Sequence, residues 1–321
     1  MNSRFATLGV LVTVAACDAR PSVVSSANQA NSTNTSCENC HRDIAEEWRG
    51  SFHRMAFTDD TFQRSLALEE PSERTFCVQC HAPEKLVANG VGCISCHGEA
   101  APRSTVTARA PHALTKDASF GTSQACASCH QFTFDAEHDG RPDLVQKTLD
   151  EHAASPFADV SCAACHMPPR RGHRDHSFAG GHALDLLRHS VRIEARRLDR
   201  DLVHVVVESS AGHAFPTGDM FRRARLLVFG ESADGSIVAS SERSFGRTWG
   251  VEAKGPQAGR RRELTDTRLR GRFEDDVRLE GSAPITRVRY ALLFERILSM
   301  RGEADVSPVS SDVIAEGLAS E

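Results

Sequence analysis

Tryptophan and tyrosine are scarce in this chain, which has two tryptophans and one tyrosine in 321 residues. Cysteine does not occur after position 165, and no apolar run beyond the N-terminus could cross a membrane. Basic residues do not predominate, because 38 of them face 43 acidic residues and the net charge is −5. This balance argues against nucleic acid as a partner. A Gly-rich phosphate loop and a Ser-His-Asp triad are also missing, which leaves nothing that points to those chemistries.

What the chain has instead is a Cys-x-x-Cys-His motif that occurs five times. Random order would give roughly 0.02 copies in a chain of this composition. The motifs use ten of the 11 cysteines, and the second and third are separated by only 11 residues. The five copies occupy residues 37–41, 77–81, 93–97, 126–130 and 162–166.

Three kinds of site compete to explain the motif. Disulfides suit an exported protein but give no reason for a histidine after every second cysteine. Zinc knuckles use Cys-x-x-Cys, yet their other two ligands come from a separate, more distant pair. Covalent haem c explains every position, because cysteines at i and i+3 lie on one face of a helical turn and the next histidine can ligate iron.

The sequence therefore predicts five covalently attached haem c groups. Motifs 77–81 and 93–97 would hold two haems close enough to exchange electrons, and porphyrins would fill the interior of a domain that is short of conventional core residues. The thioether residues are Cys37, Cys40, Cys77, Cys80, Cys93, Cys96, Cys126, Cys129, Cys162 and Cys165. The proximal iron ligands are His41, His81, His97, His130 and His166.

The N-terminus predicts export and a membrane anchor. Residues 1–16 have Arg4 followed by a short apolar run, which is typical of a signal peptide. Val-Ala-Ala-Cys17 resembles a bacterial lipobox, and Cys17 is the one cysteine outside the motifs, so we expect it to carry lipid. An ordinary signal peptide remains the alternative. Residues 17–36 would form a flexible tether of roughly 25 Å. The signal peptide and the lipid together predict a location in the bacterial cell envelope, facing the periplasm or the exterior.

The composition also predicts an α+β chain in two domains. Residues 37–188 would form a haem-packed, mostly helical and irregular domain. Short β-branched runs separated by Gly, Asp and Ser predict a small antiparallel β-sandwich over residues 189–300. Val203, Val205 and Val207 share one face of a strand there, with His204 on the other. Residues 301–321 are predicted to be a polar tail, as a fraying helix.

Ten histidines lie outside the motifs, twice the number that five irons would need at their sixth positions. These are His53, His112, His138, His152, His173, His176, His182, His189, His204 and His213.

The surroundings of the motifs resemble the multihaem cytochrome c-554 family and its c-552/4-like relatives. The matching segments are CENCHRDIAEEWRGSFHRMA, GVGCISCHG, PHALTKDASFGTSQACASCHQF, CAACHMP and AGHAFPTGDMFR. The type member has four haems and this chain has five motifs, so the two differ in that respect. The resemblance implies that the distal iron ligands are His53, His112, His176, His182 and His213.

The other histidines are expected to have different roles. His173 and His189 are alternatives to His176 and His182. His152 stands where a tryptophan stands in an internal echo of the sequence, so a packing role is favoured. His138 is expected in solvent and His204 to be structural.

These features predict an electron carrier that passes electrons between periplasmic or membrane redox proteins through mainly bis-His haems of low potential. The alternative is an oxidoreductase in which one five-coordinate haem acts on a small nitrogen or sulfur oxyanion. The chain contains no Cys-x-x-Cys-Lys variant of the motif, and the carrier is favoured.

Overall fold

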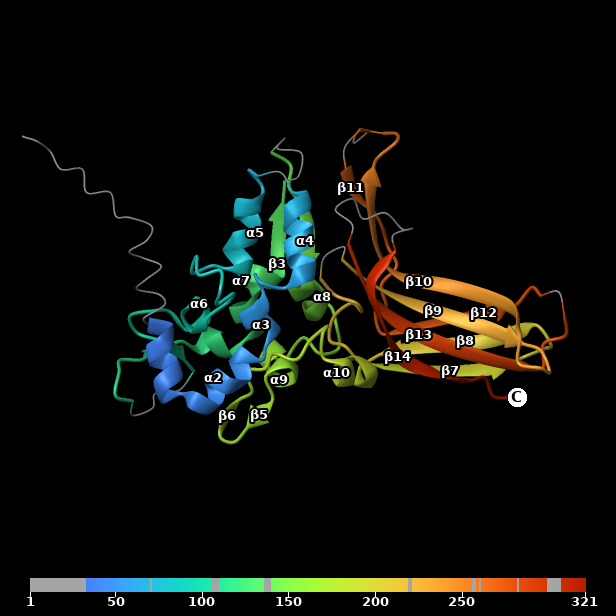
Figure 1. Ribbon diagram of the computed structural model, residues 1–321, viewed down its shortest axis with the longest axis horizontal. Helices are drawn as coiled ribbons and strands as arrows, with labels where there is room; N and C mark the ends of the chain where they lie inside the picture. Colours follow the sequence, from blue (N-terminus) through green and yellow to red (C-terminus); the bar gives the residue numbers. More distant parts are fainter. Residues whose placement is uncertain are drawn as a thin grey trace, which may run out of the picture.

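The structure of the protein is a computed structural model. The structure describes residues 33–69, 71–105, 110–135, 140–218, 221–255, 258–259, 261–281, 283–298 and 307–321. It has two parts, a helical and irregular N-terminal part (residues 33–189) and a β-sandwich (residues 191–321), side by side in Figure 1. The predicted α+β class is therefore confirmed. Among the described residues, no helix is long and apolar enough to cross a membrane.

The N-terminal part is built from short helices, and four of them end at a motif histidine. Residues 33–40 form the first described helix. The later α-helices are α2 (Arg42–Arg49), α3 (Phe52–Met55), α4 (Asp60–Leu68), α5 (Arg74–His81), α6 (Cys93–His97), α7 (Ala127–His130), α8 (Thr148–Ala153), α9 (Cys162–His166) and α10 (Leu184–His189). Two 3-10 helices, η1 (Ala118–Gly121) and η2 (Ser123–Cys126), lead into α7.

Three two-stranded ribbons connect these helices. They are β1 (Arg103–Ser104) with β2 (Thr115–Lys116), β3 (Gln131–Phe134) with β4 (Asp143–Lys147), and β5 (Pro169–Arg170) with β6 (His173–Arg174).

The predicted tether is wrong at its C-terminal end, because residues 33–36 are helical. Asn34 is fully buried, and its side-chain oxygen accepts hydrogen bonds from the backbone N–H groups of Cys93 and Ile94. Asn34 thereby satisfies donors at the start of α6 that have no partner inside the helix. Residues 1–32, with the predicted signal peptide and Cys17, lie outside the described residues.

The sandwich consists of two antiparallel sheets. One has the strand order β11-β10-β9-β13-β14 and the other β12-β8-β7. The strands are β7 (Val191–Arg197), β8 (Leu202–Ser209), β9 (Arg222–Glu231), β10 (Ile237–Val251), β11 (Arg261–Asp266), β12 (Arg272–Arg278), β13 (Arg287–Ile297) and β14 (Pro308–Leu318).

The sandwich core confirms the predicted alternation along β8. Val203, Val205 and Val207 are fully buried and pack with residues of the facing sheet such as Leu226 and Leu292. His204 points the other way, and its Nδ1 lies 2.7 Å from Asp276 on the neighbouring strand β12. Its structural role agrees with the expectation for that position.

The predicted helical tail is wrong, because residues 308–318 form β14 at the edge of the larger sheet. Only Ile314 of this strand is fully buried. An edge strand with one face in solvent needs few apolar residues, so the segment resembles a polar tail in sequence. The domain boundary drawn at residue 300 therefore cuts through the sandwich.

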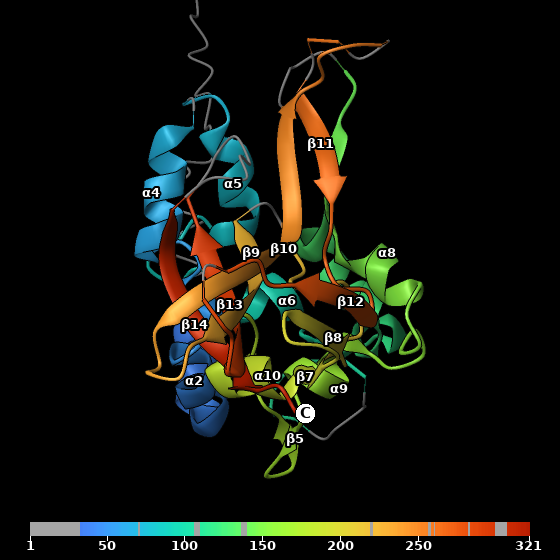
Figure 2. The same cartoon turned by 90° about the vertical axis from the view of Figure 1, so that its right-hand side faces the viewer.

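The ribbon of β11 lies beside the green strand that is β4 in Figure 2. Charged side chains join the two parts in this region. Arg268 and Glu151 form an ion pair of 2.6 Å in which both side chains are almost completely buried. Lys147 lies 3.2 Å from both Glu263 and Asp266 of the sandwich. The two parts are thus held together by a specific polar junction.

Candidate haem-binding site

Each motif forms a helical turn, as its spacing predicts. Four motifs end a helix at their histidine, namely α5 at His81, α6 at His97, α7 at His130 and α9 at His166. In the first motif the cysteines lie in the helix of residues 33–40, and His41 follows it directly. Both cysteines of a motif therefore project from nearly the same face of one turn. None of the ten motif cysteines is in a disulfide, so all of them are available for thioether bonds.

Four motif histidines have a second imidazole opposite them. The distances between ring centres are 6.3 Å for His41 and His112, 6.2 Å for His130 and His53, 6.4 Å for His97 and His176, and 6.2 Å for His166 and His213. In each pair the second residue is one of the predicted distal ligands. Every pair joins residues far apart in the sequence.

The spacing of these pairs fits an iron between the rings. A metal–imidazole bond is about 2 Å long and the bonded nitrogen lies about 1 Å from its ring centre, which gives about 6 Å between centres. Directly packed rings lie closer, as Phe52 and His182 show with 3.5 Å. Two axial histidines with paired cysteines are a donor set that suits haem c.

Backbone carbonyls orient most of these imidazoles. Five imidazoles donate from Nδ1–H to a backbone carbonyl over 2.6–3.0 Å. The pairs are His97 with Arg103 O, His166 with Ala179 O, His112 with Ala113 O, His176 with Arg174 O and His213 with Ala214 O. A carbonyl only accepts, so Nδ1 carries the proton. Each Nε2 then keeps a lone pair that can bind a metal.

Burial keeps the His53 and His130 imidazoles neutral. Desolvation lowers the pKa of each to about 4, helped by the neighbouring histidines. Neutral imidazole is the form that ligates iron. The His53 backbone is fixed as well, because its carbonyl accepts a 2.8 Å hydrogen bond from Val91 N. Gly90 approaches the same carbonyl so closely that a Cβ there would lie 2.4 Å from the oxygen.

His182 and His81 have different surroundings from the four pairs. His182, predicted to be a distal ligand, stacks on Phe52, the residue before His53. The His81 ring stacks on Phe62 at 3.8 Å, and its Nδ1–H donates to Ala56 O over 2.8 Å. No ring contact of His182 with a motif histidine occurs among the described residues, so its role as a ligand stays a prediction.

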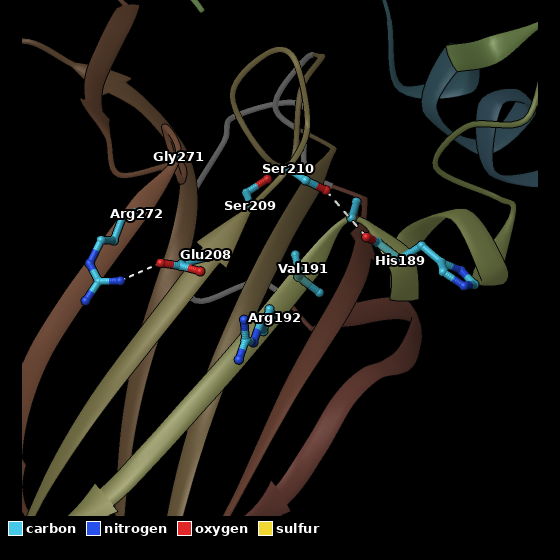
Figure 3. Close-up of a pocket in the computed structure, with 9 residues that line it drawn as sticks. His189, Val191, Arg192, Glu208, Ser209, Ser210, Gly271 and Arg272 are labelled. Atoms are coloured by element: carbon cyan, nitrogen blue, oxygen red, sulfur yellow. Dashed lines mark hydrogen bonds and ion pairs between the residues drawn. The ribbon is translucent and has the colours of Figure 1, made fainter. Parts of the chain in front are cut away.

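The alternative ligands have partners of another kind. The Nε2 of His173 lies 3.1 Å from both carboxylate oxygens of Glu47. His189 donates from Nδ1 to Asp185 O, and Figure 3 shows its ring pointing away from the surface groove between β7, β8 and β12. His152 is buried in α8 beside Gly212, which agrees with a packing role. His138 lies outside the described residues.

Glu47 is a residue that the sequence did not single out. Its carboxylate accepts a 2.9 Å hydrogen bond from His176 N and also contacts His173. Burial opposes its ionisation, but these two donors outweigh burial and hold the pKa of Glu47 below its ordinary value. Glu47 thus links α2 to the loop that carries His176. One acidic residue on an acidic helix gives no signal of such a contact.

Cysteines of different motifs lie close to one another in three places. Cys37 is near Cys93, Cys80 near Cys129 and Cys126 near Cys162, close enough for each to shift the pKa of the other. The neighbouring thiol lowers the pKa of Cys37 to about 7, of Cys129 to about 6 and of Cys162 to about 5, and the pKa of each neighbour is raised.

A small cavity lies between motifs 126–130 and 162–166. It is lined by Cys126, His130 and Cys162 together with Ser123, Ala127, Thr148 and Leu149. Three of its lining side chains are thus groups that haem c requires. The cavity and the cysteine pairs show that neighbouring motifs face one another.

Comparisons with known proteins agree with this donor set. Residues 36–98 match the family described as cytochrome c554 and c-prime. No curated protein sequence matches the chain. A crystal structure of a penta-heme cytochrome c552 from Thermochromatium tepidum is similar in fold, with a TM-score of 0.69, 21% identity, and 88% of this chain and 97% of that chain covered.

The motifs, the histidine pairs and these similarities lead to one conclusion. The chain is similar to multihaem c-type cytochromes of the cytochrome c554 family, with residues 36–98 as the matching segment, and its five motifs provide the residues that covalently bound haem c requires.

Proposed function

We propose that the protein is a five-haem electron carrier of the bacterial cell envelope, with bis-His ligation at most of its irons. The observation that carries the proposal is the set of four imidazole pairs with 6.2–6.4 Å between ring centres. When bound, haem supplies a one-electron couple. Two axial histidines would give it a low reduction potential, because methionine is the axial ligand that raises the potential. The similar structure is itself described as a penta-heme cytochrome.

The cysteine pairs support a specific order of sites. They place motif 37–41 beside 93–97, motif 77–81 beside 126–130, and motif 126–130 beside 162–166. The Cys129 charge also raises the pKa of Cys96, after burial, so motif 93–97 lies near 126–130. Every motif is thereby connected, and motif 126–130 has three neighbours.

Two measurements test the proposal. The mass of the purified holoprotein should exceed that of the polypeptide by five haem units, and its EPR spectrum should be predominantly low-spin. Four or fewer haems in fully matured protein would refute the count. A catalytic haem would instead give a high-spin signal and bind nitrite or hydroxylamine, and such a result would replace the carrier by the oxidoreductase.

The partners proposed are redox proteins of the periplasm or membrane, and no nucleic acid. Lipid attached at Cys17 would hold the carrier at the membrane. Multihaem c-type cytochromes are typically exported to the periplasm, which supports an envelope location.

A further inference from the structure

One arginine at the junction has no counter-charge among the described residues, whereas its neighbours on the strand do. Strand β9 begins with Arg222 and Arg223 and continues with Arg225. Arg223 pairs with Glu295 at 2.7 Å, and Arg225 lies 3.3 Å from Glu242. Within the part of the chain that the structure describes, Arg222 has no ion pair and no side-chain hydrogen bond.

The fold nevertheless keeps a defined space for this side chain. A Cβ on Gly218 would lie 2.8 Å from Nη1 of Arg222, and a Cβ on Gly181 would lie 3.5 Å from its Nε. Gly218 has φ of +106°, a conformation that favours glycine. The guanidinium therefore sits between a loop of the N-terminal part and a loop of the sandwich.

A second cation lies directly across the sheet. Arg296 on β13 is the backbone partner of Arg222 on β9. Arg296 already binds Asp312 at 2.8 Å and donates to Gly181 O at 2.5 Å. Two cations directly opposite each other destabilise a sheet, and Asp312 compensates one of them. An anion beside Arg222 would compensate the other.

The side chains nearest to Arg222 indicate where that anion lies. Gly181, whose Cβ position lies 3.5 Å from Arg222 Nε, precedes His182, and the His182 ring stacks on Phe52 with 3.5 Å between ring centres. Gly218 follows Thr217, whose hydroxyl lies 2.9 Å from that of Thr148, and Thr148 lines the cavity that also contains Cys126 and His130. His130 is the motif histidine paired with His53. A haem attached beside it brings two propionate carboxylates, and a guanidinium binds carboxylates through a planar fork of donors.

We propose that Arg222 binds the propionates of the haem attached through Cys126 and Cys129. The inference rests on the proposed function, since it requires that haem. The sandwich then supplies a counter-charge to the haem with the most neighbours. Neutralising a propionate favours the less positive, reduced iron, so Arg222 holds the potential of this haem above the value it would otherwise have.

The test compares Arg222→Gln with Arg278→Gln in the full-length holoprotein. Arg278 is exposed and binds Asp201 at the β7–β8 turn. Arg278→Gln therefore removes the same charge as Arg222→Gln, but at a distance from the motifs. Arg222→Gln should lower the reduction equilibrium constant of one haem by about tenfold. Redox-difference infrared spectra should show shifted propionate carboxylate bands, whereas Arg222→Lys should retain most of the wild-type potential.

The haem that responds must be the correct one. His53→Met should raise the potential of the haem at motif 126–130, because methionine is the potential-raising ligand. The haem whose reduction potential falls in Arg222→Gln should be the same haem whose reduction potential rises in His53→Met. A shift in another haem, or potentials and carboxylate bands equal to those of Arg278→Gln, would overturn the assignment.

Two further outcomes distinguish a failure of this inference from a failure of the carrier proposal and from a failure to fold. A wild-type mass without haem at Cys126 and Cys129 would refute the carrier proposal, whereas five haems with an unaffected Arg222→Gln would refute only the Arg222 contact. If Arg222→Gln does not mature, Arg222→Lys carries the test. Infrared bands identical to wild type in mature Arg222→Lys would then overturn the contact, because an ammonium cannot reproduce the guanidinium fork.

Discussion

The imidazole planes of His166 and His213 are within 10° of parallel, and their ring centres lie 6.2 Å apart. His166 ends helix α9 of the N-terminal part, whereas His213 follows β8 in the sandwich. Both rings donate from Nδ1 to a backbone carbonyl, so each can direct Nε2 at a metal between them. The sandwich therefore contributes a ligand candidate to the last motif.

His213→Ala should convert one haem in five to a high-spin form. Removing the imidazole opens the sixth position at the iron that His166 holds, so the reduced protein should bind carbon monoxide at one new site. EPR and carbon monoxide difference spectra measure both effects. His204→Ala is the matched control, because His204 binds Asp276 on the sandwich surface. A wholly low-spin spectrum in His213→Ala would show that another residue ligates this iron.

Gly90→Ala should disturb the site of His53 specifically. Gly90 has φ of +54°, and its Cβ would lie 2.4 Å from His53 O and 2.6 Å from Arg54 O. We expect the His53 backbone to move and the EPR signal of one low-spin haem to change. Gly235→Ala is the control, because Gly235 has φ of +86° with open space around it. That variant should lose only about 1 kcal/mol of stability from backbone strain and keep the wild-type spectrum.

Arg268→Met should destabilise the junction between the two parts. Arg268 binds both Glu151 and Asp266, and removing one partner of a buried ion pair costs about 3–5 kcal/mol. The variant should show a lower melting temperature in circular dichroism of the sandwich. Arg272→Met, which breaks exposed pairs with Glu208 and Glu274, should change stability by less than about 1 kcal/mol. Equal effects of both substitutions would contradict the importance of the buried junction.

The same junction should weaken in acid. Burial raises the pKa of Asp266, but Arg268 and Lys147 outweigh burial and hold that pKa well below its ordinary value. A carboxyl with a depressed folded pKa stabilises the protein above its unfolded pKa, about 4, and this contribution is lost as the pH falls. Melting temperatures should drop between pH 5 and pH 3, as estimated from these pKa values, and Asp266→Asn should reduce that drop. An unchanged drop in Asp266→Asn would assign the acid sensitivity to other carboxyls.

Cys17→Ser should release the protein from the membrane fraction. The prediction comes from the Val-Ala-Ala-Cys segment and from the single cysteine outside the motifs. Lipid on Cys17 gives stable anchoring, so the variant should appear in the soluble fraction with its haems intact. Asp18→Ser, which alters the next residue and keeps the cysteine, should remain with the membranes. Unchanged fractionation of Cys17→Ser would exclude this anchor.

Local signals predicted the parts of the fold that depend on short stretches of sequence. The Cys-x-x-Cys-His motifs are helical turns, and the apolar runs at residues 202–208 and 224–231 are strands. β14 was missed because an edge strand needs few apolar residues. β12 was missed for a similar reason, since its sequence RFEDDVR is mostly exposed.

The site depends on contacts that no local pattern encodes. His112, His176 and His213 were reached through a family resemblance, whereas composition alone left ten histidines for five positions. Which motif each one faces depends on tertiary contacts such as that of Glu47 with the backbone of His176. Arg222 gave no signal, because an arginine at the start of a strand is ordinary until its neighbours are seen to have partners.

The pairing of His166 with His213 also sets an order for assembly. A chain exported N-terminus first presents motif 162–166 before the segment that carries His213. The last iron would therefore stay open to solvent and to foreign ligands until the strands on either side of His213 have folded. Completion of the sandwich would close that site, so the final coordination bond would mark the mature protein.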